Sequence, residues 1–115
     1  QKKVKSIKDF LIDHLSATLV YIFGSASSGN FRDDSDIDIA FLTNKDLDSY
    51  QIYSLAQKLA SKIDREIDLI NLKEASTVFK AQIVGEGEVV FTEDEHFKNE
   101  FELRVLKEYA LLNEE

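Results

Sequence analysis

The order of apolar and polar positions along the chain predicts alternating helices and strands. In several segments apolar residues recur every three or four positions, as on one face of a helix. Helices are expected at residues 4–15, 47–64, 74–84 and 93–112, the third of them ended by Gly85 and Gly87. Short runs rich in β-branched and aromatic residues predict strands at residues 19–23, 36–42, 66–72 and 89–91. We therefore expect an α+β protein, with a small mixed β-sheet flanked by helices.

Length and composition indicate one globular domain over residues 1–115. Of the 115 residues, 43% are hydrophobic and 31% are charged, which is enough for one core and too hydrophobic for a disordered chain. The chain contains no cysteine, which excludes disulfides and thiolate zinc sites. No stretch approaches the roughly 20 apolar residues that span a bilayer, and no signal-peptide pattern opens the chain, so we expect a cytoplasmic protein without a membrane partner.

The balance of charge narrows the possible partners. The chain has 22 acidic and 14 basic residues, for a formal net charge of −8. An acidic surface repels the phosphate backbone, which dominates affinity for nucleic acids. A long nucleic acid is therefore not the expected substrate of this domain.

A glycine and a serine after the first predicted strand suggest a phosphate-binding turn. Gly24 ends the apolar run 19–23, and Ser25 follows it. Glycine lets the backbone turn tightly and approach a ligand, and a serine at the start of a helical turn offers a hydroxyl and an N–H to a phosphate. Taken alone, a Gly-Ser pair after a strand is common and carries little weight.

Three aspartates are candidates for a metal site. Asp36 and Asp38 are separated by one residue in a predicted strand, so they point to the same face, away from the apolar residues that alternate with them. Asp68 lies in the next predicted strand, and the three carboxylates meet if the two strands are neighbours. Carboxylates this close repel each other unless a cation lies among them, and hard oxygen ligands favour Mg²⁺. Each aspartate alone could equally be a solvated surface residue, but their occurrence together after Gly24 favours a site.

This combination resembles the DNA polymerase β-like nucleotidyltransferase superfamily, and within it the minimal nucleotidyltransferase (MNT) branch. The resemblance rests on Gly24-Ser25, on Asp36-x-Asp38 after ten intervening residues, and on the later strand with Asp68. It covers about residues 19–91 and implies the polymerase β-like fold, with ATP as substrate and two Mg²⁺ ions as cofactor. Gly24 and Ser25 would hold the triphosphate, and the three aspartates would bind the metal and be catalytic.

The resemblance also implies a partner. Members of the MNT branch are often encoded beside a HEPN-domain protein, as antitoxin and toxin. It therefore implies a protein adenylyltransferase that moves AMP from ATP onto a tyrosine of a HEPN ribonuclease toxin. Two other functions stay open: an antitoxin that neutralises its partner by binding alone, and transfer of a nucleotide to a small molecule such as an aminoglycoside. The small-molecule chemistry usually needs a second substrate domain, which has no room in this chain.

One departure from the family pattern concerns positive charge. Many relatives carry an arginine or another large residue soon after Gly-Ser, where this chain has three small residues, Ala26, Ser27 and Ser28. Arg32 and Ser35 do match frequent family positions, and both are assigned to nucleotide binding. Arg32 would supply part of the missing charge for the phosphates.

The last predicted helix has two apolar stripes. The first contains Phe97, Phe101, Val105, Tyr109 and Leu112. The second contains Leu103, Leu106 and Ala110. One stripe is enough to dock the helix on its own domain. The second indicates either a surface for another protein chain or burial in a larger core.

Overall fold

The computed structural model describes residues 2–24 and 36–113. Its elements, in chain order, are α1 (Lys2–Leu15), β1 (Ala17–Phe23), β2 (Ile37–Thr43), α2 (Ser49–Ile63), β3 (Ile67–Asn71), the short 3₁₀ turn η2 (Leu72–Glu74), α3 (Thr77–Glu86), β4 (Glu88–Thr92) and α4 (Glu95–Asn113). All the predicted helices and strands are present, with boundaries shifted by a few residues. None of the helices in this described part is long and apolar enough to cross a membrane.

The strands form one mixed sheet in the order β3-β2-β1-β4. β1 pairs antiparallel with both β2 and β4, whereas β2 and β3 are parallel. Parallel neighbours need a crossover connection, and α2 supplies it between β2 and β3. The mixed sheet expected from the sequence is confirmed, and the parallel pairing brings the start of β2 beside the start of β3.

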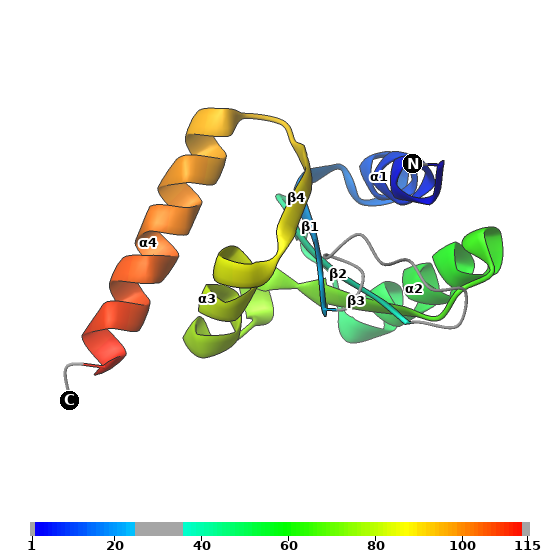
Figure 1. Cartoon of the computed structure of the whole chain (residues 1–115). Helices are drawn as coiled ribbons and strands as arrows, with labels where there is room; N and C mark the ends of the chain where they lie inside the picture. The colour runs from blue at the N-terminus through cyan, green and yellow to red at the C-terminus, as the bar shows by residue number, and fades with distance from the viewer. Residues whose placement is uncertain (1, 25–35, 114–115) are drawn as a thin grey trace.

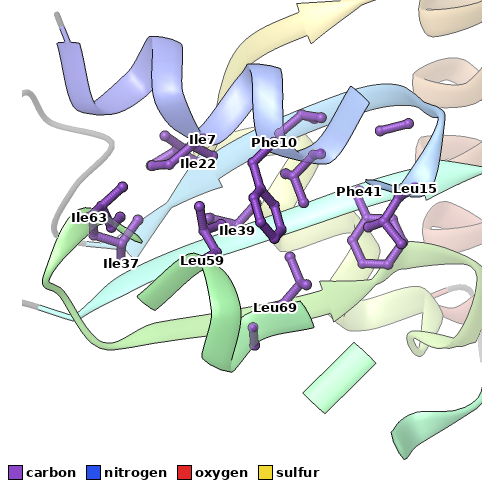
Figure 2. Close-up of a cluster of buried hydrophobic side chains, with 14 residues drawn as sticks. Ile7, Phe10, Leu15, Ile22, Ile37, Ile39, Phe41, Leu59, Ile63 and Leu69 are labelled. Carbon is purple, nitrogen blue, oxygen red and sulfur yellow. The ribbon is translucent and has the colours of Figure 1, made fainter. Parts of the chain in front are cut away.

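One face of the sheet is covered by α1 and α2 (Figure 1). Ile37, Ile39 and Phe41 alternate along β2 and are fully buried on this face. Figure 2 shows the side chains of Ile7 from α1 and Leu59 from α2 in the same apolar cluster. Burying one such side chain stabilises the fold by about 1.5–3 kcal/mol. This layer therefore holds the larger of the two apolar clusters.

The opposite face carries α3 and α4 over a smaller apolar cluster (Figure 1). Phe101 and Val105 of α4 are buried there. Tyr21 of β1 is also fully buried, and its hydroxyl donates a hydrogen bond to Glu102 Oε2 at 2.6 Å. Burial and this bond to a carboxylate raise the pKa of the Tyr21 hydroxyl. The hydrogen bond ties α4 to a central strand of the sheet.

The connection between β3 and α3 differs from the prediction because polar side chains cap its turns. The strand expected over residues 66–72 ends at Asn71, whose Oδ1 accepts a hydrogen bond from the backbone of η2 at 3.1 Å. The helix expected from residue 74 begins after Ser76, whose Oγ accepts the N–H of Phe79 at 3.1 Å. Short polar side chains that bind nearby N–H groups stop one element and start the next.

The glycines after residue 84 also act differently from the prediction. Helix α3 continues through Gly85 and is capped at Gly87, whose N–H donates to the Ile83 carbonyl at 2.7 Å. A Cβ at Gly85 would meet nothing within 4 Å, whereas one at Gly87 would lie 2.7 Å from that same carbonyl. Only the second glycine is required by the packing.

Candidate active site

Asp38 and Asp68 lie side by side on the face of the sheet that carries α3 and α4. Asp38 of β2 is opposite Asp68 of β3 in the parallel register, and opposite Phe23 of β1 in the antiparallel one. Residues paired across neighbouring strands point to the same face. Asp36 directly precedes β2, although the strand was expected to include it. The expected arrangement of Asp38 and Asp68 on neighbouring strands and one face is confirmed.

The electrostatics of the three carboxylates centre on Asp38. This residue is half-buried, whereas Asp36 and Asp68 are exposed. Burial raises the pKa of the Asp38 carboxyl, and the negative charges of Asp68 and Asp36 raise it further. A raised pKa means that the surroundings disfavour the ionised form. A divalent cation would relieve this repulsion, and carboxylate oxygens are the ligands that Mg²⁺ prefers, so the chemistry of these donors suits a magnesium ion.

Gly24 is in close contact with Asp38. Its φ of +74° lies in the left-handed region, and a Cβ at this position would be 2.5 Å from Asp38 Oδ2. A side chain here would displace the carboxylate and would also strain the backbone. Gly24, directly after β1, therefore leaves the space that the Asp38 carboxylate occupies.

Two parts of the expected site stay predictions, namely the nucleotide contacts and the metal ligation. Ser25, Arg32 and Ser35 are outside the described residues, so their nucleotide-binding roles stay predictions. Within residues 2–24 and 36–113, no three acidic or histidine side chains form a group that could hold a metal ion. Closure of all three aspartates around a metal therefore also stays a prediction.

An aromatic pair borders the carboxylates and was not singled out from the sequence. Phe23 shares a sheet face with Asp38 and packs edge-on against Phe79 of α3, with ring centroids 5.8 Å apart and an interplanar angle of 82°. An apolar ring paired opposite a carboxylate lowers its hydration, in the direction of the raised pKa of Asp38. The sequence signal for Phe23 was its place directly before Gly24, whereas the contact with Phe79 depends on tertiary packing.

The sequence of the chain matches a known protein family over most of its length. The family described as "Polymerase beta, Nucleotidyltransferase" matches residues 5–96 of the chain. The chain belongs to this polymerase β nucleotidyltransferase family. The matched range includes every strand of the sheet and all three aspartates.

Among nucleotidyltransferases of known sequence, the chain is similar to the protein adenylyltransferase MntA of Shewanella oneidensis. The two are 49% identical over 69 residues, which make up 60% of this chain and 50% of that protein. The matched stretch thus spans half the length of this relative.

Solved toxin-antitoxin structures match over nearly the whole chain. A crystal structure of a toxin-antitoxin with AMP-PNP has a TM-score of 0.88 and 36% identity, covering 95% of this chain and 88% of that one. A structure of the tri-AMPylated Shewanella oneidensis HEPN toxin in complex with MNT antitoxin has a TM-score of 0.85 and 34% identity, covering 97% and 87%. The polymerase β-like fold expected from the sequence is confirmed by these matches.

Proposed function

We propose that this chain is a Mg²⁺-dependent protein adenylyltransferase and an antitoxin, which transfers AMP from ATP to a tyrosine of a HEPN ribonuclease toxin. The observation that carries the proposal is the pairing of Asp38 with Asp68 beside Gly24 in a nucleotidyltransferase fold. The similarity to a protein named adenylyltransferase and to a complex with an AMPylated HEPN toxin supports the choice of acceptor.

The proposed reaction forms one bond and breaks one. The tyrosine hydroxyl oxygen attacks the α-phosphorus of ATP, and the bond from that phosphorus to the bridging oxygen of the β-phosphate breaks. The products are tyrosyl-AMP and pyrophosphate, and the hydroxyl proton is given up as the new bond forms. Bound Mg²⁺, with two ions implied by the family resemblance, supplies charge neutralisation and lowers the pKa of the attacking hydroxyl.

The chain's own residues would divide this work. Asp36 and Asp38 would hold metal and nucleotide together, and exposed Asp68 would contribute to metal binding and help accept the hydroxyl proton. Gly24 keeps Asp38 Oδ2 in place by leaving room for it. Ser25, Arg32 and Ser35 complete the proposal as contacts to the triphosphate.

A second candidate function is neutralisation of the partner by binding alone, and α4 offers a surface for such binding. Leu103 and Leu106 have exposed fractions of 54% and 47%, and Ala110 is exposed as well, so the second apolar stripe expected from the sequence is on the surface. Figure 1 shows α4 as the outermost helix on its side of the sheet. We propose this stripe as a docking surface for the HEPN partner, a role compatible with catalysis or with occlusion.

The mass of the partner separates the two functions. The proposed HEPN partner would be purified and incubated with this chain, ATP and Mg²⁺, and its intact mass measured. Added adenylyl mass, absent for the double variant Asp36→Ala with Asp38→Ala, is the expected result. A stable complex with no change in mass would reject the transferase and leave the binding function.

A further inference from the structure

The edge strand β3 carries a groove that begins next to the candidate active site. The sheet order leaves β3 with β2 on one side and no other described strand on the other. An open groove of about 570 Å³ runs along this free side, within the range of ligand-binding clefts. It is lined by the start of α2, by residues 69–71 of β3 and by the segment that leads into α3.

The backbone of β3 presents hydrogen-bonding groups to this groove. The Ile37 N–H donates to the Glu66 carbonyl at 3.0 Å, while Ile37 is paired in register with Ile67. In a parallel ladder this pattern turns the N–H and C=O of the paired residue away from its neighbour. Ile67 and Leu69 therefore direct their backbone groups outward, and Asp68 directs its own toward β2. Outward groups on alternate residues match an extended chain and no other regular structure.

The side chains of the groove define what kind of segment fits. Leu69, Ile70 and Phe79 give it apolar walls, and Asp48 and Glu74 are exposed acidic residues on its rim. Nearby, Lys73 is already paired with Asp46 at 3.1 Å, outside the residues that line the groove. An extended segment with apolar side chains and at least one lysine or arginine is complementary to this surface.

We infer that the free edge of β3 binds the acceptor segment of the partner as an added strand, which delivers its tyrosine to Asp68. From Asn71 back to Asp68 is three residues of strand, about 10 Å. A chain paired along residues 69–71 reaches Asp68 after one further residue, on the face where Asp38 also lies. This inference rests on the proposed function and adds to it the way in which the acceptor is recognised.

Substitution at the groove tests the inference by kinetics. Ser49→Trp places a large side chain in the groove from the exposed first turn of α2, and Ser61→Trp is the matched control at an exposed serine elsewhere on the same helix. We expect Ser49→Trp to raise KM for the HEPN acceptor at least tenfold, with unchanged affinity for a non-hydrolysable ATP analogue. Ser61→Trp should match the wild type in both.

Residue-resolved amide exchange tests the same inference without any substitution. Adding the acceptor should slow exchange of the Ile67 and Leu69 amides, which point outward, and leave the inward Asp68 and Ile70 amides unchanged. If the wild type transfers AMP but Ser49→Trp behaves like Ser61→Trp and the outward amides show no protection, the strand-addition inference is overturned while the proposed function stands. If the wild type transfers no AMP, the proposed function fails, and the inference fails with it.

Discussion

The two faces of the sheet differ in how completely apolar side chains cover them, and β2 shows the difference within one strand. Ile37, Ile39 and Phe41 point toward α1 and α2 and are fully buried. Asp38, between two of them, points to the other face and is only half-buried. The same strand thus contributes apolar side chains to the core on one face of the sheet. On the other face it holds a carboxylate that apolar side chains cover only in part. The candidate site therefore depends on the apolar core for its position, while the charge of its carboxylates opposes folding.

Asp38→Asn is expected to have the largest effect, with a loss of AMP transfer and no loss of stability. Transfer of AMP should fall about 10³-fold, because Asp38 would help hold the cation that stabilises charge at the reacting phosphate. Stability should not fall. The folded-state pKa of Asp38 is raised, so its contribution is favourable at low pH and is lost as pH rises through that pKa. At pH 7 the ionised carboxylate opposes folding, and the variant should melt at the same or a higher temperature.

The pH dependence of the difference in melting temperature between Asp38→Asn and the wild type provides the control. Thermal melts of both proteins without metal should converge as pH falls toward the unfolded-state pKa of about 3.9. A variant that melts well below the wild type at pH 7 would show that Asp38 is structural, contrary to this account.

Leu59→Ala is expected to lower stability and leave AMP transfer unchanged, because it weakens the packing of the sheet face that carries α1 and α2. Leu59 is fully buried, so its truncation should lower the free energy of unfolding by about 2–5 kcal/mol. Transfer per folded molecule should stay close to the wild-type rate at low temperature. Urea unfolding combined with activity measured on the folded fraction checks both statements. A loss of activity per folded molecule would show that this face also determines transfer.

Gly24→Ala should moderately lower both stability and AMP transfer, since Gly24 follows β1 and lies against Asp38 of the site. The left-handed φ costs about 1–2 kcal/mol for a residue with a side chain, and the new Cβ would collide with Asp38 Oδ2. We expect a lower melting temperature and at least a tenfold loss of transfer. Gly85→Ala is the matched control, because a Cβ there meets nothing within 4 Å. Equal behaviour of the two variants would argue against a positioning role for Gly24.

Tyr21→Phe should give the smallest of these effects. It removes the hydrogen bond from the buried hydroxyl to Glu102 and should cost about 1–2 kcal/mol. Because Tyr21 pairs with Ala40 and not with an aspartate of the candidate site, transfer per folded molecule should not change. Chemical unfolding of Tyr21→Phe and of the double variant Tyr21→Phe with Glu102→Gln measures this; a double variant much less stable than the single one would show that Glu102 stabilises α4 by other contacts.

The sequence predicted the elements and the aspartates better than it predicted their pairing. Alternation of Ile37, Asp38 and Ile39 was enough to assign the two faces of β2, because strand side chains have a period of two. The register of Asp38 with Asp68 could only be supposed, since it depends on the crossover through α2. The end of β3 at Asn71 was missed because a side-chain cap, which spacing does not reveal, decides it.

Helix α4 shows a second limit of prediction from sequence. Its docking stripe was expected to include Phe97 and Leu112, yet these are 39% and 51% exposed, while Phe101 and Val105 between them are buried. Periodicity identifies the face of a helix but not how far its neighbours extend along it. In Figure 1 the C-terminal end of α4 is directed away from the sheet, which leaves the end of the stripe uncovered.

Titration calorimetry with a non-hydrolysable ATP analogue tests most directly whether the aspartates form one magnesium-nucleotide site. We expect binding in Mg²⁺ that weakens at least tenfold when the metal is removed, or when Asp38→Asn is combined with Asp68→Asn. Asp13→Asn, an exposed aspartate of α1 across the sheet, should bind like the wild type. Equal affinity of the double variant and the wild type in Mg²⁺ would contradict the account.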